Sequence, residues 1–580
     1  MWNKLTLSNL ALLFLDLILI VFLVYDFGFK NLEEFRQYKI IVLPSLVIAL
    51  MAFNLYKYRI FRQRGESGKI PKINLIYLSF LLVLETVLVL ANSDLSFTDA
   101  LFKQRYILEA GLLFYFLTRL SLLLRKFYGL YFNPAILFVG SFGLIALVGT
   151  FMLMLPAATT NGISFIDALF TATSATAVTG LIVVDTAVDF TYFGQTVIMV
   201  LFQLGGLGML TFTSFFAYFF KTGASYRESL YMQNILGHDR LGGVMARVMQ
   251  IVVFSLVIEA IGAMLIYFSL SSEVTDEKGF FAVFHAISAY CNAGFSLATD
   301  GLYDSGLRFN YFMQWVVMVL IVFGGLGYHI AYNVTQYLRR LALNIFAKGR
   351  KKFIARVVLL NTKITIVTTA ILLTVGTVFF SLSEQATILS GHSSIFGKFT
   401  TSLFASVTAR TAGFNTVDMT DFTIPGILFM IFLMWIGASP ASTGGGIKTT
   451  TFALATLNIF TVARDSPHIE IGTRRIASDA VKRAFAIISI SLAIIGTGIL
   501  LLLIFNPEFT LIQIAFEVFS AYSTVGLSLG ITSALSENSK YVIIFVMFIG
   551  RIGLLNLMIG LLRSVNQSAY QYPEENIMIN

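Results

Sequence analysis

Apolar residues gather in twelve long runs, each near the length needed to cross a bilayer. A transmembrane helix needs about 20 predominantly apolar residues, and the runs of this 580-residue chain meet that need approximately. They cover residues 7–28, 40–56, 73–91, 107–124, 133–156, 193–220, 248–270, 310–336, 358–382, 424–460, 484–505 and 540–563. No small-residue cleavage motif follows the first run, so we interpret it as a transmembrane helix and not as a signal peptide. The pattern predicts an all-α polytopic membrane protein.

Short segments that end in glycine lie between the last eight runs. They read TATSATAVTG, HAISAYCNAG, FASVTARTAG and VFSAYSTVG, and their final glycines stand 114, 119 and 113 residues apart. This regularity indicates a fourfold internal repeat. Each unit reads as a helix, a short re-entrant helix, a glycine loop and a second helix; irregular backbone of that kind exists at membrane depth only where it lines a watery cavity. We therefore predict four pseudo-symmetric helix–pore-loop–helix repeats around a central pore.

The repeat also divides the chain into predicted domains. They are an N-terminal transmembrane extension of about four helices (1–130), pore repeat 1 (131–235), pore repeat 2 (236–345), pore repeat 3 with an intramembrane loop (346–470), and pore repeat 4 with a C-terminal tail (471–580). Few ionisable residues lie within the extension, Asp16 and Glu85 being the exceptions. We favour a packing or assembly role for it over a sensor role, because buried ionisable groups are what usually mark a site in a membrane.

Charged residues make up only 12% of the chain, and they set its orientation in the membrane. Basic residues cluster in the connections 57–72 and 339–356, the latter carrying Lys348, Arg350, Lys351 and Lys352, whereas the stretch 155–192 holds three aspartates and no Lys or Arg. Because basic loops stay on the cytoplasmic side, we predict that the glycine segments open outward and that both termini are cytoplasmic. The net charge of +9 is thus read as membrane anchoring in the cell membrane, with the lipid bilayer and no nucleic acid as partner.

The glycine segments favour a site for a monovalent cation. Backbone carbonyls replace the hydration shell of a potassium ion without fixing it by full charges, and glycine reaches the left-handed conformations that align successive carbonyls. The absence of Asp and Glu from these segments argues against a divalent cation. The candidate ion-binding residues are Thr176, Ala177, Val178, Thr179, Gly180, Cys291, Asn292, Ala293, Gly294, Arg410, Thr411, Ala412, Gly413, Ser523, Thr524, Val525 and Gly526, with K⁺ held at the filter carbonyls.

A candidate gate lies in the helix after the third segment, within MWIGASPASTGGGIKTTTF at 434–452. Pro440 and the glycines around it predict a break into a loop at membrane depth, which blocks permeation in one state and moves aside in another. A kink without gating remains the alternative. A phosphate-binding loop is disfavoured, because Ile447 separates Gly446 from Lys448 and no strand precedes them.

Arg551, inside the last run, is expected to face a cavity or a partner at that depth. We expect it to contact carbonyls of the broken loop and hold the gate closed, or to repel cations. The candidate gate residues are Gly437, Ser442, Thr443, Gly444, Gly445, Gly446, Lys448 and Arg551.

Other chemistries find little support in the sequence. The single cysteine and the five histidines (His238, His285, His329, His392 and His468) lack metal-ligand spacing, and we predict that the histidines are satisfied locally. An enzyme would need a constellation of acid, base or metal ligands, and none is apparent. An alternating-access carrier would need two related halves and several intramembrane acids, but Glu259 is the only acid within a span of the repeat. We therefore predict no enzyme and no cofactor in this chain.

At this point the motifs identify a family resemblance. TAVTG, CNAGF, RTAGFNT, STVGLS, SPASTGGGIKTTTF and FIGRIG resemble the Trk/Ktr/HKT superfamily of potassium transporters over about residues 130–565, and SVTARTAGFNTVD and SAYSTVGLSLGIT are most similar to the Ktr membrane subunit (KtrB/TrkH-like). Members of this superfamily resemble four fused potassium-channel subunits. The resemblance implies that the four glycines line a selectivity filter, that 437–448 form the gating loop and that Arg551 is associated with the gate.

The resemblance also carries expectations about ion and partners. Plant members with serine at the first filter position tend to be sodium-selective, so Gly180 implies potassium; a sodium or mixed Na⁺/K⁺ transporter of the same superfamily is the alternative. Family membrane subunits form homodimers and associate with a cytoplasmic ring of nucleotide-binding RCK-domain proteins (TrkA/KtrA-like). This chain has no dinucleotide-binding motif of its own, so such regulation would come from a separate subunit. Typical Ktr subunits have none of the four N-terminal helices, and Trk subunits have two.

Overall fold

The computed structural model of the chain is mostly helical in its described part. It describes residues 4–29, 36–63, 69–91, 107–116, 119, 134–207, 244–271, 277–346, 358–440, 442–472 and 474–553. The α-helices within these residues are α1 (Lys4–Gly28), α2 (Arg36–Gln63), α3 (Lys69–Ala91), α5 (Pro134–Leu153), α6 (Phe165–Ala177), α7 (Tyr192–Gly206), α10 (Val244–Ser269), α11 (Lys278–Cys291), α12 (Tyr311–Leu326), α13 (Tyr328–Phe346), α14 (Leu360–Ser383), α15 (Ile395–Thr408), α16 (Ile424–Trp435), α17 (Thr449–Ala463), α18 (Ser478–Phe505), α19 (Leu511–Ser523) and α20 (Glu537–Ile552). A two-residue hairpin, β1 (Glu470–Ile471) with β2 (Arg474–Arg475), lies between α17 and α18.

The predicted all-α membrane fold is confirmed. Four described helices are long and apolar enough to cross a membrane alone: Pro71–Leu90, Met249–Ser269, Leu360–Ser383 and Ser478–Phe505. Large apolar side chains project from their outer faces, among them Val253 and Ile261 on α10, which are 53% and 55% exposed. Such faces suit contact with lipid.

Two of the predicted runs differ from the observed helices. The run 310–336 is not one helix: α12 and α13 meet at an angle of 101°, because Gly327 between them has φ 75° and cannot continue a helix. In the last run, helix α20 ends at Ile552, before Gly553, whose φ is 79°. Parts of the runs 107–124, 193–220 and 540–563 lie outside the described residues, as do Lys348, Arg350, Lys351, Lys352 and His238.

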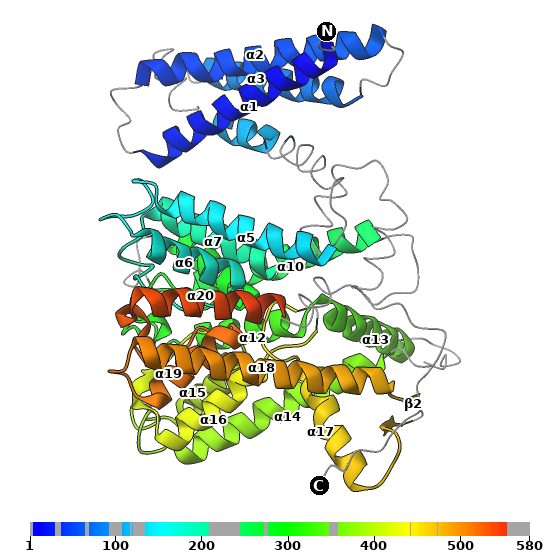
Figure 1. Cartoon of the computed structure of the whole chain (residues 1–580), viewed down its shortest axis with the longest axis vertical. Helices are drawn as coiled ribbons and strands as arrows, with labels where there is room; N and C mark the ends of the chain where they lie inside the picture. The colour runs from blue at the N-terminus through cyan, green and yellow to red at the C-terminus, as the bar shows by residue number, and fades with distance from the viewer. Residues whose placement is uncertain are drawn as a thin grey trace.

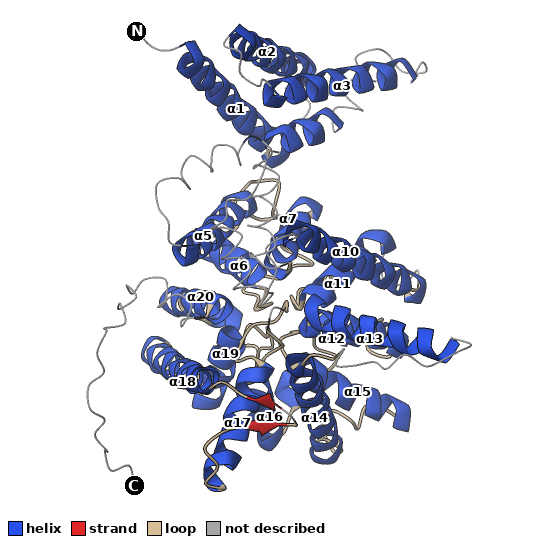
Figure 2. Cartoon of the chain, turned by 90° about the vertical axis from the view of Figure 1, so that its right-hand side faces the viewer, coloured by secondary structure: helices blue, strands red, loops and turns tan. Residues whose placement is uncertain are grey.

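Four similar helix groups surround the centre of the molecule, as Figures 1 and 2 show. The groups are α5–α6–α7, α10–α11–α12, α14–α15–α16 and α18–α19–α20, and we call the middle helix of each, which has 13 or 14 residues, its short helix. Each short helix packs against the first helix of its own group, and α6, α11 and α19 also pack against the last helix of theirs. Each short helix packs in addition against the last helix of the preceding group: α11 against α7, α15 against α12, α19 against α16, and α6 against α20. The last of these contacts joins the fourth group to the first and closes the ring.

The hydrophobic core follows the same ring. Four separate clusters of buried side chains each join two consecutive groups; Phe202 with Phe284 links the first to the second, and Ile266 with Phe404 the second to the third. Phe380 with Phe516 links the third to the fourth, and Phe142 with Ile543 the fourth to the first. Because burial of these side chains is the main favourable term, the four groups stabilise one another.

The N-terminal helices form a separate core. Leu12, Leu46 and Leu78, from α1, α2 and α3, are buried in one cluster. Asp16 in α1 accepts a hydrogen bond from Arg119 Nε at 2.8 Å, so this predicted ionisable residue is paired within the extension. The extension touches the pore groups where Ala157 N donates to Gly28 O at 2.8 Å. The predicted domain boundaries stay predictions; those at 130 and 235 lie outside the described residues.

Local sequence explains where the short helices begin. Ser164, Ser394 and Thr510 cap α6, α15 and α19, each accepting a hydrogen bond from a backbone N–H of the first turn. Gln513 completes a capping box with Thr510, which satisfies two backbone donors that the helix leaves unpaired. The caps hold the short helices with their C-terminal ends toward the glycine segments.

Candidate functional site

The four glycines predicted from the sequence meet in one closed ring, which we call the glycine ring. A Cβ built on Gly180 would lie 2.4 Å from Ala293 O, and one on Gly413 would lie 2.3 Å from Val525 O. A Cβ built on Gly294 would lie 3.0 Å from Ala412 O, and one built on Gly526 would lie 2.2 Å from Thr179 O. Each segment therefore lies against the next, and the fourth against the first, with no room for a side chain at these positions.

All four glycine segments share an unusual backbone. The glycines have φ of 87°, 71°, 79° and 94°, and the residue two positions earlier is also left-handed: Val178, Asn292, Thr411 and Thr524, with φ from 51° to 65°. In the first, second and fourth segments this residue is the cap of the short helix, and its N–H bonds back to the last turn. The left-handed cap ends the helix and turns the chain into the ring.

Hydroxyl groups on the short helices hold the ring from behind. Ser174 Oγ donates to Leu181 O at 2.8 Å and accepts from Gly180 N at 3.1 Å. Ser288 Oγ donates to Phe295 O at 2.8 Å, and Gly526 N donates to Ser520 Oγ at 3.1 Å. These serines all stand six residues before a ring glycine, a spacing that the sequence analysis missed although it is visible there.

The third repeat differs from the others. Its short helix ends five residues before Gly413 instead of three, and the hydroxyl that bonds the backbone after the glycine is Thr408, whose Oγ1 donates to Phe414 O at 2.5 Å. Two residues, Ala409 and Arg410, therefore lie between the helix end and the left-handed Thr411. The Nη2 of Arg410 donates a hydrogen bond to Gly437 O at 3.2 Å. Arg410, predicted as an ion-binding residue, thus uses its side chain to contact the candidate gate, and only its backbone belongs to the ring segment.

The structure brings the predicted ion-binding residues together and buries most of them. Gly294 and Gly526 are partly exposed, whereas the remaining members of that set are all buried. The hydroxyls of Thr179, Ser523 and Thr524 have no hydrogen-bond partner among the described residues. Unpartnered oxygens at a ring of this kind suit a hydrated or partly dehydrated cation, since buried polar atoms otherwise find partners.

The predicted break in the third repeat is present and touches the ring. We call residues 436–448, between α16 and α17, the broken segment. Its two ends are joined, because Gly437 N donates a hydrogen bond to Ile447 O at 2.8 Å. Within its second half, Lys448 Nζ donates to Gly444 O at 2.6 Å. A Cβ on Gly444 would lie 2.1 Å from Thr411 Oγ1, and one on Gly445 would lie 2.3 Å from Thr524 Oγ1. The glycines of this segment therefore allow it to lie directly against two ring segments.

Further hydrogen bonds fasten the broken segment to the second repeat. Thr443 Oγ1 donates to Tyr290 O at 3.3 Å, and Ser439 Oγ donates to Leu326 O at 2.5 Å. Ser442 Oγ bonds within the segment, to Ser439 O at 2.6 Å. The polar side chains of this otherwise apolar stretch thus satisfy carbonyls that a break at membrane depth leaves open.

Arg551 contacts the broken segment as the sequence predicted. Its Nη1 donates to Thr443 O, and its Nη2 donates to Gly205 O at the end of α7, at 2.5 Å. Arg551 lies in the last turn of α20 and not in the middle of a longer described helix. The guanidinium therefore bridges the third repeat to the first.

Outside the ring, His285 and His392 have their hydrogen-bond partners close by. His392 contacts Tyr311 Oη at 2.9 Å and Thr401 Oγ1 at 3.2 Å, and His285 contacts Phe281 O and Ser296 Oγ. Glu259 accepts two hydrogen bonds from Gln203, at 2.9 and 3.1 Å, and the Cys291 thiol donates to the same glutamine. No group of metal-ligating side chains occurs within the residues that the structure describes.

Comparisons with known proteins agree with the site's position in the chain. The family model for TrkH cation transport proteins matches residues 126–571, which include all four ring segments and exclude most of the N-terminal extension. The chain is 38% identical over 448 residues to the Ktr system potassium uptake protein B of Vibrio alginolyticus, covering 77% of this chain and 94% of that protein. It is equally identical over 447 residues to the protein of the same name from Bacillus subtilis, covering 77% and 96%.

Two further matches extend the comparison. The potassium/sodium uptake protein NtpJ of Enterococcus hirae is 35% identical over 459 residues, covering 77% of this chain and 97% of that protein. The crystal structure of the potassium transporter TrkH from Vibrio parahaemolyticus resembles this fold with a TM-score of 0.58 at 18% identity, covering 84% of this chain and 96% of that chain. From the extent of the family match and the identity to these relatives, the chain belongs to the TrkH family of cation transport proteins, which are membrane transporters and not enzymes.

Proposed function

We propose that the chain is the ion-translocating subunit of a potassium uptake system of the Ktr type, and that the glycine ring is its selectivity filter. The single observation that carries the proposal is the closure of the ring, in which each of four left-handed glycines lies against the backbone of the next repeat. Four backbone segments around one axis present carbonyl oxygens to a cation without any carboxylate, as selection of a monovalent ion requires. The names of the relatives, potassium uptake protein B in two bacteria, support potassium as the ion.

In this proposal the broken segment is a gate and Arg551 holds it closed. Support comes from its position against Thr411 and Thr524 of two ring segments and from the hydrogen bond that Arg551 donates to Thr443 O. A cation that leaves the ring would meet both this backbone and the positive charge of Arg551. Opening requires the segment to move, and its glycines absorb the changes in backbone dihedral angles.

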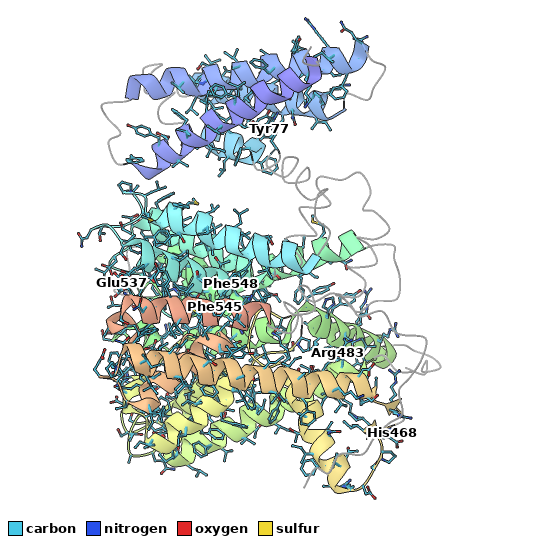
Figure 3. All side chains as sticks on the ribbon, viewed as in Figure 1. Tyr77, His468, Arg483, Glu537, Phe545 and Phe548 are labelled. Carbon is cyan, nitrogen blue, oxygen red and sulfur yellow. The ribbon has the colours of Figure 1, made fainter. Side chains whose placement is uncertain are left out.

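The proposal includes partners and orientation. The relatives are named as parts of a Ktr system, which supports a separate cytoplasmic subunit, an RCK-domain nucleotide-binding protein, and a homodimeric membrane subunit. Figure 3 shows Glu537, at the start of α20, and Arg483, near the start of α18, at opposite ends of the helical layer. Arg474 and Arg475 form β2, which lies in Figure 1 at the opposite end of the helical layer from α6 and α19, and Lys482 and Arg483 follow in the first turns of α18. This arrangement supports a cytoplasmic position for the basic end and an outward-facing ring.

Flux through the purified protein in liposomes tests the function. A potassium gradient with a clamped membrane potential should drive a steady current, because each charge gains about 2.3 kcal/mol per 100 mV. The current should reverse near the potassium equilibrium potential and should need no proton gradient. A flux that requires proton coupling would instead indicate an alternating-access carrier.

A second candidate function is transport of sodium together with potassium. The name of NtpJ, a potassium/sodium uptake protein 35% identical to this chain, favours it. The same liposomes distinguish the two: with potassium on one side and sodium on the other, a strongly displaced reversal potential supports potassium selectivity, and one near zero supports mixed transport.

A further inference from the structure

Two of the short helices carry a buried ionisable side chain at the same place. His285 in α11 and Glu517 in α19 each stand nine residues before the ring glycine of their repeat, Gly294 and Gly526. Both side chains are fully buried. Neither residue has a role in the ion path or the gate proposed above, and burial of such groups is costly unless their polar atoms are bonded.

Glu517 bonds to the chain just beyond the ring. Its Oε1 accepts a hydrogen bond from Ser528 Oγ, and its Oε2 accepts one from Thr532 Oγ1 at 3.0 Å. Ser528, two residues after Gly526, is also 2.9 Å from Thr532 Oγ1. Two hydroxyl groups thus donate to this buried carboxyl group, one to each of its oxygens, as buried polar atoms require.

His285 makes the matching contact in the second repeat. Its Nε2 lies 3.0 Å from Ser296 Oγ, and Ser296 is two residues after Gly294. Its Nδ1 lies 2.9 Å from Phe281 O; since a carbonyl only accepts, Nδ1 carries the hydrogen, and in the neutral ring Nε2 accepts from Ser296. The imidazole of His285 also stacks on the phenyl ring of Phe281, with 3.9 Å between the ring centroids. Its centroid lies 6.4 Å from that of Phe414, the residue after Gly413.

The other two repeats lack this contact. At the positions nine residues before and two after the glycine, the first repeat has Thr171 and Ile182 and the third has Phe404 and Asn415. Thr171 Oγ1 has no hydrogen-bond partner among the described residues, and Asn415 donates to Asp300 O instead. Because the ring runs in the order of the repeats, the contacts of His285 and Glu517 lie on opposite sides of it.

We propose that Glu517 and His285 are positioning residues that fix the outer edge of the filter through Ser528 and Ser296. The inference rests on the proposed filter function of the ring. Each ring segment is held on its inner side by the end of a short helix; in the second and fourth repeats these two side chains hold its outer side as well. Cation discrimination depends on the placement of the ring oxygens, so release of either contact loosens discrimination on that side without removing an ion ligand.

The test is the potassium to sodium permeability ratio, obtained from reversal potentials in proteoliposomes. Glu517→Leu and His285→Leu remove the contacts while keeping a large side chain, and each should lower the ratio about tenfold, the factor that corresponds to about 1.4 kcal/mol. Glu517→Gln keeps one acceptor and adds a donor, and should restore most of the ratio. Thr171→Val is the matched control, because it changes the same helix position in a repeat that lacks the contact, and it should leave the ratio unchanged.

Two further variants keep the test decisive if a leucine variant does not fold. Ser528→Ala and Ser296→Ala remove the same bonds from the partly exposed side, and each should reproduce the loss. A ratio equal to that of the wild type in folded Glu517→Leu or Ser528→Ala, judged by a monodisperse elution profile, would overturn the proposal. If the wild-type protein itself does not discriminate between the ions, the proposed filter function fails, which is a separate result.

Discussion

At the scale of single residues, the ring depends on backbone conformations that side chains disfavour. In every segment a left-handed residue with a side chain precedes a left-handed glycine by two positions, as Val178 precedes Gly180. A left-handed residue other than glycine costs about 1–2 kcal/mol, and hydrogen bonds to the helix end, such as Val178 N to Ala175 O at 3.0 Å, offset this cost. At the glycine, conformation and lack of space act together, so no other residue fits unchanged.

Gly180→Ser should weaken discrimination against sodium. The new Cβ would stand 2.4 Å from Ala293 O, a backbone atom, so the first and second ring segments must separate. Reversal potentials in mixed potassium and sodium measure the effect, with an expected fall of about tenfold or more in the permeability ratio, as for a change above about 1.4 kcal/mol. Gly162→Ser is the control, because Gly162 has φ 84° but nothing within 4 Å of its Cβ position. Unchanged potentials in Gly180→Ser would refute the filter assignment.

His392 should make the stability of the folded protein sensitive to acid. Burial, with the positive charges of Arg308 and Lys398 nearby, lowers the pKa of His392 below its ordinary 6.5. The folded state then holds the neutral ring while the unfolded state takes up a proton, so stability is complete above pH 6.5 and declines as the pH falls below it. Thermal unfolding in detergent from pH 8 to pH 5 should show this decline, and His392→Gln should flatten it. The same change at the partly exposed His468 should not.

At the scale of elements, the broken segment joins all four repeats. It belongs to the third repeat, contacts Thr524 of the fourth, bonds to Tyr290 of the second, and reaches the first through Arg551 and Gly205 O. An element with contacts to every repeat responds to a change in any of them. A displaced helix end in any repeat would therefore alter one of the bonds of this segment.

Arg551→Ala should raise the flux. The change removes the bonds to Thr443 O and Gly205 O and also the positive charge beside the proposed ion path. Deletion within 442–446 should act in the same direction, since it removes the glycines that lie against the ring. Initial rates of potassium uptake into liposomes measure both, with Arg475→Ala on the exposed hairpin as the control of equal charge. A lower flux in folded Arg551→Ala protein would reject the gate hypothesis.

The sequence predicted the ring and the break because both rest on glycine and proline, whose backbone effects are local. It did not predict the ends of α12 and α20, although Gly205, Gly324, Gly437 and Gly550 recur 119, 113 and 113 residues apart. Gly205, Gly324 and Gly550 each lie against a carbonyl at the end of a short helix, Thr176 O, Tyr290 O and Tyr522 O. The sequence also did not predict the contacts of Glu517 with Ser528 and Thr532. These contacts depend on how the chain after the glycine packs back on the short helix, and such packing leaves no periodic pattern in the sequence.

At the scale of the whole molecule, one chain must close a ring that four separate subunits would close by symmetry. Three of the junctions between consecutive repeats join neighbours in sequence, but the fourth joins α20 to α6, near the two ends of the matched region. The stretch of chain between these two helices is longer than that at any of the other three junctions, and bringing together the ends of a longer stretch costs more conformational entropy. Specific contacts at this junction therefore carry particular weight.

The ion pair at this junction should contribute measurably to stability. Lys540 Nζ lies 2.6 Å from Asp167 Oδ1, and the two side chains are 13% and 22% exposed. Asp167 also lies in the first turn of α6, where a negative charge is favourable. Lys540→Ala should lower the free energy of unfolding by about 1 kcal/mol, above the median for exposed pairs, seen as a lower thermal midpoint in detergent. Lys398→Ala, which removes a lysine that has no ion pair among the described residues, is the control. A double-mutant cycle with Asp167→Asn isolates the pair, and additive effects of the two changes would show that the junction closes without it.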